Sequence, residues 1–188
     1  MTNEITVGSM ADLANRQGMS MAESFMSASH IVLIDVSGSM GDRDSRGGRS
    51  RFEVACDELR LLQRDMPGKV AVVAFSDDAT FCPGGVPVPT WGGTNLAGAL
   101  QFVSPADGTV TFIVISDGLP DGPDRALAVA AGMVSTIHTV FVGPETGYDA
   151  QGRYFLDKLA AAHHGQSVTD KAAMQLAEKV TRLMLSGN

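Results

Sequence analysis

The sequence predicts an α/β fold with a mostly parallel central sheet. Short, continuous apolar runs alternate along the chain with segments of helical periodicity. Such runs are typical of strands that are buried on both faces of a parallel sheet. Regular alternation of strands and helices favours a parallel sheet whose crossover connections are right-handed.

The strands are predicted from these apolar runs and from their boundaries. The first run, His-Ile-Val-Leu-Ile-Asp, ends in a carboxylate. Residues 79–92 contain three prolines and three glycines, so we expect an irregular connection with room for one edge strand. The expected strands cover residues 30–35, 69–75, 109–116 and 135–142, with a marginal strand at 165–168.

Helices are predicted between the strands from apolar spacing and end signals. Pro67-Gly68 ends the first of them, and Thr94 is expected to cap the second. Asp121 and Asp124 are expected to begin the third, near its positive end. The predicted helices cover residues 52–64, 94–102, 121–134, 153–162 and 171–185.

Length and the N-terminal sequence determine the expected domain organisation. A chain of 188 residues predicts one domain, which we place at residues 30–188. Residues 1–29 are expected to form an arm that is partly helical or flexible. This arm either packs on the domain or is left loose, or it serves in partner binding or oligomerisation. Because no basic start precedes an apolar core in this segment, no secretory signal is expected, and a cytoplasmic location is predicted.

Composition argues against two classes of partner. The chain has 14 Lys+Arg and 21 Asp+Glu, a formal net charge of −7, which argues against binding to a nucleic-acid backbone. No apolar run approaches the ~20 residues of a membrane helix, so no membrane span is expected. The two cysteines cannot form a disulfide framework and are expected to be reduced thiols.

Polar oxygen ligands follow the predicted strands at the edge where α/β sheets bind ligands. Asp35, Ser37 and Ser39 follow the first strand, Asp117 follows the strand at 109–116, and Thr94 stands in Gly-Gly-Thr-Asn. Two carboxylates and three hydroxyls are all hard oxygen ligands. The expected occupant is therefore a divalent cation that keeps some waters: Mg²⁺ first, Mn²⁺ second and Ca²⁺ third.

The pattern Asp35-x-Ser37-x-Ser39, with Thr94 and Asp117, resembles the metal-ion-dependent adhesion site of von Willebrand factor A domains. All five motif positions are filled, and the resemblance spans about residues 30–185. It implies a Rossmann-like, mainly parallel sheet with helices on both faces. It also implies that Ser37 and Ser39 bind Mg²⁺ or Mn²⁺ directly, and that the two aspartates hold it directly or through waters. Thr94 would join or leave with conformational state.

The same resemblance implies a binding module rather than an enzyme. Members of the family bind partners, usually proteins, and a partner carboxylate often completes the coordination of the ion. Intracellular members act as adaptors or complex subunits, some alongside chaperone-like ATPases. A protein partner that presents Asp or Glu, such as an ATPase or another complex subunit, is therefore expected here. The oligomeric state does not follow from the sequence.

The loop at residues 41–51 departs from the motif. It is long and contains Arg43, Arg46, Arg49 and Arg51. Its acidic positions imitate part of a calcium loop, but Arg46 occupies a ligand position, so no calcium loop is expected. Two interpretations stay open: a solvated, mobile connection, or a basic rim that recognises acidic groups of a partner.

The sequence also leaves two alternatives to a binding module: a phosphatase and a structural domain. A Mg²⁺-dependent phosphatase of the haloacid dehalogenase-like kind would use Asp35 as nucleophile, but Ser37 stands where that chemistry needs a second Asp. Neither a P-loop nor a Gly-x-Ser-x-Gly elbow occurs. A structural domain with a vestigial site is the second alternative. Trp91, the single tryptophan, is expected to pack in the core, with an interface anchor as the alternative.

Overall fold

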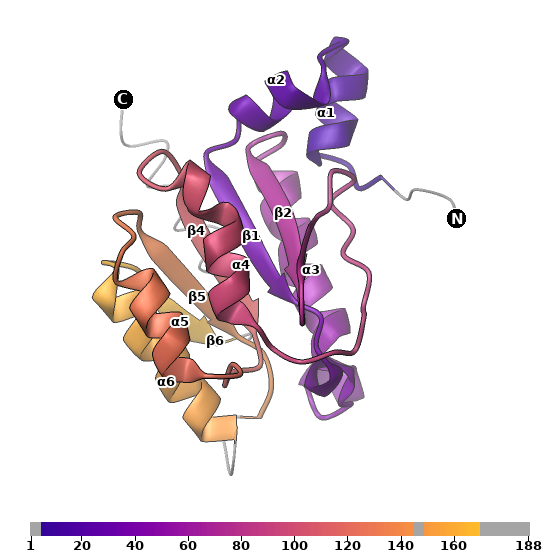
Figure 1. Ribbon diagram of the computed structural model, residues 1–188. Helices are drawn as coiled ribbons and strands as arrows, with labels where there is room; N and C mark the ends of the chain where they lie inside the picture. Colours follow the sequence, from indigo (N-terminus) through magenta and orange to yellow (C-terminus); the bar gives the residue numbers. More distant parts are fainter. Residues whose placement is uncertain (1–4, 145–148, 170–188) are drawn as a thin grey trace.

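The protein is described here by a computed structural model that covers residues 5–144 and 149–169. Its described part contains a six-stranded sheet in the order β3-β2-β1-β4-β5-β6 (Figure 1). Only β3 is antiparallel to its neighbour, as expected for an edge strand in the proline-containing connection. The strands are β1 (His30–Asp35), β2 (Val70–Phe75), β3 (Ala79–Phe81), β4 (Thr111–Ser116), β5 (Ile137–Phe141) and β6 (Ser167–Thr169).

The central strands are buried on both faces, as their continuous apolar sequences predict. Every residue of β1, β2 and β5 is buried. In the parallel register, Asp35 at the end of β1 pairs with Phe75 at the end of β2, and Ile34 pairs with Ile115 of β4. The carboxyl ends of β1, β2 and β4 therefore meet at one edge of the sheet.

Helices cover both faces of the sheet, so the predicted architecture is confirmed. On one face α4 (Leu96–Val103), α5 (Pro123–Ala130) and α6 (Asp149–Ala162) pack over the alternate side chains of β1, β2 and β4. On the other face α3 (Arg51–Asp65) packs over the remaining ones. Short 3₁₀ turns form at η1 (Gly38–Gly41), η2 (Arg46–Gly48) and η3 (Ser104–Ala106).

Helix caps set two boundaries near the carboxyl edge. Ser50 and Glu53 form a reciprocal capping box at the start of α3. The cap of α4 is Asn95, whose side chain accepts a hydrogen bond from the N–H of Gly98, so the assignment of Thr94 as this cap is wrong. The predicted helix at 171–185 lies outside the described residues.

The N-terminal segment packs against the opposite end of the sheet through α1 (Met10–Gln17) and α2 (Met21–Met26) (Figure 1). Met10 is 1% exposed and joins the core cluster beneath α4. The N–H of Thr6 donates to Gly84, and the N–H of Gly68 donates to Gly8. Of the two interpretations of this arm, its described part adopts the packed one; a role in partner binding stays a prediction.

Candidate metal centre

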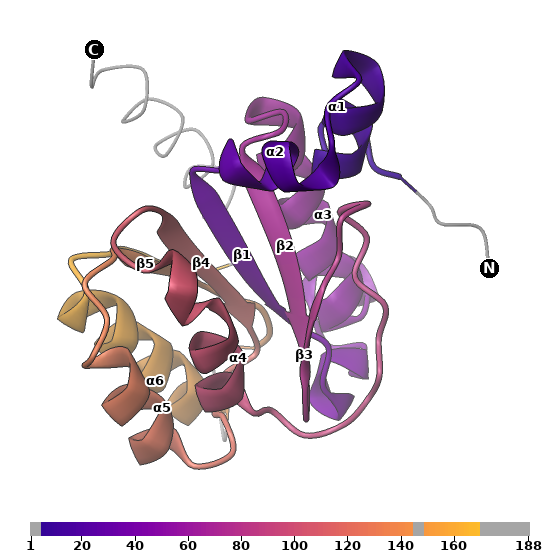
Figure 2. The same cartoon turned by 45° about the horizontal axis from the view of Figure 1, so that its top comes forward.

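Loops from several strands bring the predicted site residues to the carboxyl edge of the sheet. Asp35 ends β1, Ser37 and Ser39 lie in the turn that follows it, and Asp117 directly follows β4. Thr94 lies in the connection between β3 and α4, which passes this edge of the sheet (Figure 2). That connection is tied to the first turn because the N–H of Gly38 donates to the carbonyl of Gly92 at 3.0 Å.

Asp35 is the most deeply placed carboxylate of the site. Its side chain is fully buried, and both of its oxygens accept hydrogen bonds. Oδ1 accepts from the N–H of Ser37 at 2.8 Å, and Oδ2 accepts from the hydroxyl of Ser116 at 2.7 Å. Burial raises the pKa of Asp35 to about 6, with a further contribution from the negative charge of Asp117, although these hydrogen bonds oppose the shift. A cation in the site would favour the charged form.

The two serine hydroxyls are neighbours. The Oγ atoms of Ser37 and Ser39 lie 3.4 Å apart, with Ser37 buried and Ser39 exposed at the surface. Oxygens that occupy adjacent positions around Mg²⁺ lie about 3 Å apart, given metal–oxygen distances of roughly 2.1 Å. The pair is therefore close to the spacing at which two hydroxyls can share one ion.

Asp117 contacts a cation that the chain itself supplies. The guanidinium of Arg51, at the first position of α3, donates from Nη1 to Oδ2 of Asp117 at 2.7 Å. The same guanidinium donates from Nε and Nη2 to the two oxygens of Asp44, at 2.8 and 2.6 Å. These charge-assisted bonds hold the pKa of Asp44 below its usual value.

Two aspartates outside the motif hold the loop that carries Thr94. Asp121 accepts from the N–H of Thr94 at 2.8 Å and returns its own N–H to the Thr94 carbonyl at 3.0 Å. Asp77 accepts from the N–H of Gly93 at 3.0 Å. A Cβ at Gly92 would lie 2.1 Å from the Asp77 carboxylate, so the close approach requires glycine there. The interpretation of Asp121 as a helix start missed this role.

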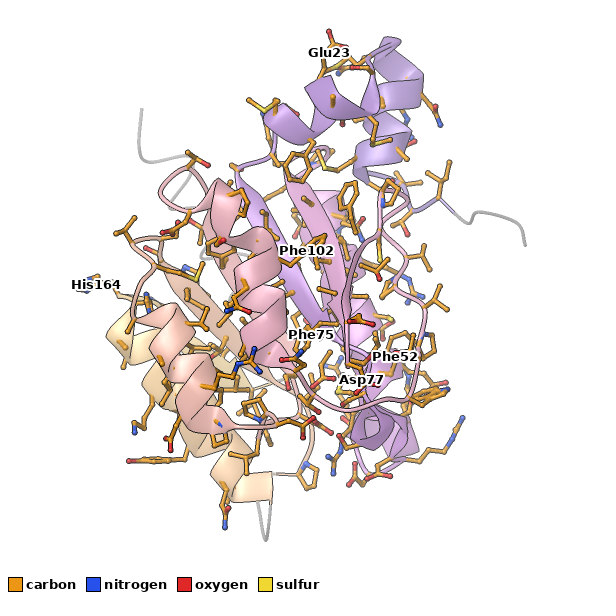
Figure 3. The ribbon with its side chains drawn as sticks, in the orientation of Figure 1. Glu23, Phe52, Phe75, Asp77, Phe102 and His164 are labelled. Carbon is orange, nitrogen blue, oxygen red and sulfur yellow. The ribbon has the colours of Figure 1, made fainter. Side chains whose placement is uncertain are left out.

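Trp91 lies at the surface beside the site, so the prediction that it packs in the core is wrong. It is 52% exposed and adopts a φ of 57°, which is rare outside glycine. Its indole packs edge-on against Phe52 with 6.1 Å between ring centroids, and a Cβ at Gly41 would lie 3.1 Å from its Cζ3. These residues line a hollow of about 430 Å³ together with Arg43. Figure 3 shows Phe52 and Asp77 at this end of the molecule.

Most of the loop arginines are engaged within the chain, which changes both interpretations of the 41–51 loop. Arg46 donates to the buried Glu58 at 3.0 Å, Arg49 pairs with Asp57, and Arg51 is buried. Arg43 alone of the four has a side chain more than half exposed, 3.9 Å from Glu53. The loop is therefore held by ion pairs, and its basic side chains do not form a continuous positive rim.

The donor types fit a hard divalent cation, because hydroxyl and carboxylate oxygens lie at the ends of two adjacent strands, β1 and β4. Among the described residues, no group of three or more His, Cys, Asp or Glu has the arrangement of a metal site, so a metal site at this edge would depend on the hydroxyls. Sequence reasoning missed Ser116 and the contact of Arg51. Ser116 could have been found, because it precedes Asp117 in the same Ser-Asp-Gly turn.

No family model matches the chain, and no curated protein does. Solved structures do match. An aerotolerance-related membrane protein from Bacteroides fragilis is 17% identical, with a TM-score of 0.66 over 82% of this chain and 98% of that one. A von Willebrand factor type A protein from Catenulispora acidiphila is 16% identical, with a TM-score of 0.59 over 81% of this chain and 41% of that one. The chain has the von Willebrand factor A fold.

A further structure with this A-type fold comes from the manganese-loaded TRAP protein of Plasmodium vivax. It is 16% identical, with a TM-score of 0.55 over 80% of this chain and 72% of that one. At these identities the likeness establishes the fold alone, so the expected A-type architecture is confirmed and the metal site stays a prediction. No helix in the described part of the chain has the length and apolar character needed to cross a bilayer.

Proposed function

We propose that this A-type domain is a protein-binding module that captures its partner through a divalent cation, Mg²⁺ or Mn²⁺. Asp35, Ser37, Ser39, Thr94 and Asp117 would hold the ion. The observation that carries the proposal is the pair of adjacent hydroxyls, 3.4 Å apart, placed beside two buried carboxylates at the carboxyl edge of the sheet. The manganese in the TRAP protein supports the choice of a divalent cation for this fold.

The hydrogen bonds of the site support different roles for Asp35 and for the two serines. Both oxygens of Asp35 already accept hydrogen bonds, so Asp35 would orient the serines and act on the ion chiefly by charge. Ser37 and Ser39 are neutral ligands. An ion held largely by hydroxyls and waters keeps much of its positive charge, and it attracts an incoming anion strongly in a partly dry site.

The partner would therefore present the carboxylate of an Asp or Glu side chain as the last ligand. Trp91, supported by the half-buried Phe52, stands beside this position, and exposed aromatic residues at a binding edge often anchor a partner. A complex subunit such as an ATPase is the kind of partner expected. A cytoplasmic location stays a prediction.

The phosphatase alternative is not favoured. A nucleophilic carboxylate needs one oxygen open to the substrate, whereas Asp35 is fully buried with both oxygens hydrogen-bonded. Ser37, two residues later, uses its N–H to bind Asp35, and its hydroxyl is a poor proton donor at neutral pH.

The direct test is titration of the metal-free protein with MgCl₂ and with MnCl₂ by calorimetry, together with thermal unfolding. A ligand that binds only the native state at a hundredfold excess over its Kd stabilises that state by about 2.7 kcal/mol. The melting temperature should therefore rise in millimolar metal. The double variant Ser37→Ala/Ser39→Ala should lose this rise. The control Ser104→Ala, at an exposed serine that caps the C-terminal end of α4, should keep it.

A second experiment tests whether binding of the partner depends on the metal ion. Affinity for an identified partner should be lost in chelator and in the Ser37→Ala/Ser39→Ala variant, and retained in Mg²⁺. Equal affinity with chelator and with Mg²⁺ would contradict the metal bridge and move the interface to another surface.

A further inference from the structure

Arg51 occupies an unusual place for a basic side chain. It stands at the first position of α3, where the helix dipole disfavours positive charge. Its side chain is only 4% exposed. A buried guanidinium at a helix N-terminus needs acidic or hydrogen-bonding groups that compensate its desolvation. The partners of Arg51 therefore indicate its role.

Those partners join the motif loop to the metal centre. Arg51 reaches Asp117 at the end of β4 through one nitrogen, and Asp44 in the loop after η1 through two others. Its own N–H donates to the carbonyl of Asp42 at 3.1 Å. One side chain therefore connects the start of α3, the loop after the serines and a proposed metal ligand.

The end of β5 leaves room for this side chain. Gly143 has a φ of 137°, and a Cβ at that position would lie 3.2 Å from Nε of Arg51 and 3.5 Å from its Cζ. A residue with a side chain would be both strained and crowded there. The backbone beside the carboxyl edge is therefore shaped around the guanidinium.

Charge accounts for the arrangement. Asp35 and Asp117 are 0% and 7% exposed, and two carboxylates in such a place repel each other when no cation is present. Arg51 is the buried positive group of this cluster. It reduces the formal charge of Asp35, Asp44 and Asp117 from −3 to −2.

We propose that Arg51 is a built-in counter-ion of the metal centre, which holds the carboxyl edge together without metal and competes electrostatically with the divalent cation. This inference rests on the proposed metal site. Arg51 acts through Asp117, so it is a positioning residue rather than a ligand. A positive charge beside the cation lowers its affinity, and removal of that charge should raise it.

The experiment measures Mg²⁺ binding by calorimetry and unfolding in EDTA and in saturating Mg²⁺, for wild type and three variants. Arg51→Gln should unfold at a lower temperature in EDTA and bind Mg²⁺ about tenfold more tightly. Arg51→Lys keeps the charge and should bind Mg²⁺ within about threefold of wild type. Arg46→Gln, which breaks a loop ion pair with Glu58, should lose stability without a change in Mg²⁺ affinity.

The opposite signs of the two effects distinguish a counter-ion from a purely structural residue, because loss of structure alone would weaken metal binding. If Arg51→Gln is unfolded in EDTA, it should fold when Mg²⁺ is added. The proposal is overturned if this variant binds Mg²⁺ no more tightly than wild type, or if it stays unfolded in saturating Mg²⁺.

The same measurements separate this inference from the proposed function. A wild type without a Mg²⁺ response, combined with a response gained in Arg51→Gln, would overturn the metal-dependent function and support Arg51 as the charge that replaces the ion. The absence of a response in both proteins would overturn both proposals. A response in wild type that does not increase in Arg51→Gln would overturn the counter-ion alone.

Discussion

Gly118 and Gly152 meet backbone to backbone where α6 crosses the end of β4. A Cβ built on Gly152 would lie 2.4 Å from the Cα of Gly118 and 2.7 Å from the backbone nitrogen of Leu119. Gly118 has a φ of 139° and directly follows Asp117. The position of α6 and the turn that carries Asp117 are therefore coupled by a contact that only glycines allow.

A side chain at Gly152 should weaken the proposed metal site, although Gly152 is not one of its ligands. Gly152→Ala must move either α6 or the turn at 117–119, and overpacking of this kind costs about 2 kcal/mol of the free energy of unfolding. Urea unfolding measures the loss, and calorimetry should show weaker Mg²⁺ binding. Gly132→Ala, at an exposed position whose nearest atom would be 3.5 Å away, is the control and should behave as wild type.

Ser116 should support the buried carboxylate of Asp35. Ser116→Ala removes a hydrogen bond of 2.7 Å to Oδ2, and a buried acceptor that loses its donor costs about 1–3 kcal/mol. The pKa of Asp35 should rise further, because this bond opposes the effect of burial. Urea unfolding at pH 7 would show the loss. An unchanged stability would contradict the role assigned to Ser116, with the exposed Ser104→Ala again as the reference.

The N-terminal arm should contribute to stability through one side chain. Met10 is 1% exposed, and its carbonyl accepts a buried hydrogen bond from the hydroxyl of Ser24 at 3.0 Å. Met10→Ala should therefore lower the free energy of unfolding by about 2–4 kcal/mol. Met26→Ala, at a side chain that is 83% exposed, should change it by less than about 0.5 kcal/mol. Equal effects of the two substitutions would show that α1 is not part of the core.

The buried His30 should make the folded protein less stable in acid. Burial lowers its pKa to about 4, with a smaller contribution from His138. The unfolded chain takes up a proton near pH 6.5 and the folded chain does so only near pH 4, so stability from neutral His30 is lost as the pH falls through this range.

The comparison is between wild type and His30→Gln in unfolding experiments from pH 7 to pH 4. Wild type should lose roughly 2 kcal/mol more than the variant over this range. His164→Asn serves as the control, because His164 is exposed and asparagine tolerates its φ of 55°. A wild type and a His30→Gln protein with parallel pH profiles would contradict the prediction.

Much of the architecture could be predicted from local sequence. Continuous apolar runs identified β1, β2, β4 and β5, because strands buried on both faces need apolar side chains at nearly every position, whereas β3 was expected only as an edge strand in the irregular connection. Helical spacing placed α3 within a residue at each end, and the structure adds the Ser50 and Glu53 capping box at its start. The Asp35-x-Ser37-x-Ser39 spacing and the turn at Asp117 also predicted which loops face one edge, since parallel strands end together.

The remaining features were decided by tertiary contacts. Arg51 was placed in a surface loop by its basic neighbours, but it binds Asp117, 66 residues away, once β4 and α3 are packed together. Trp91 was expected in the core, but its indole lies at the surface against Gly41 and Phe52.

The sequence by itself determined which segments form strands and helices, the resemblance to the von Willebrand factor A pattern, and which polar residues lie at the carboxyl edge of the sheet. These features depend on local periodicity and on the geometry of parallel strands. Only the tertiary structure decided which charges meet. Arg51, Asp44 and Asp117 come from separate elements, and their pairing depends on burial and distances that no local spacing encodes.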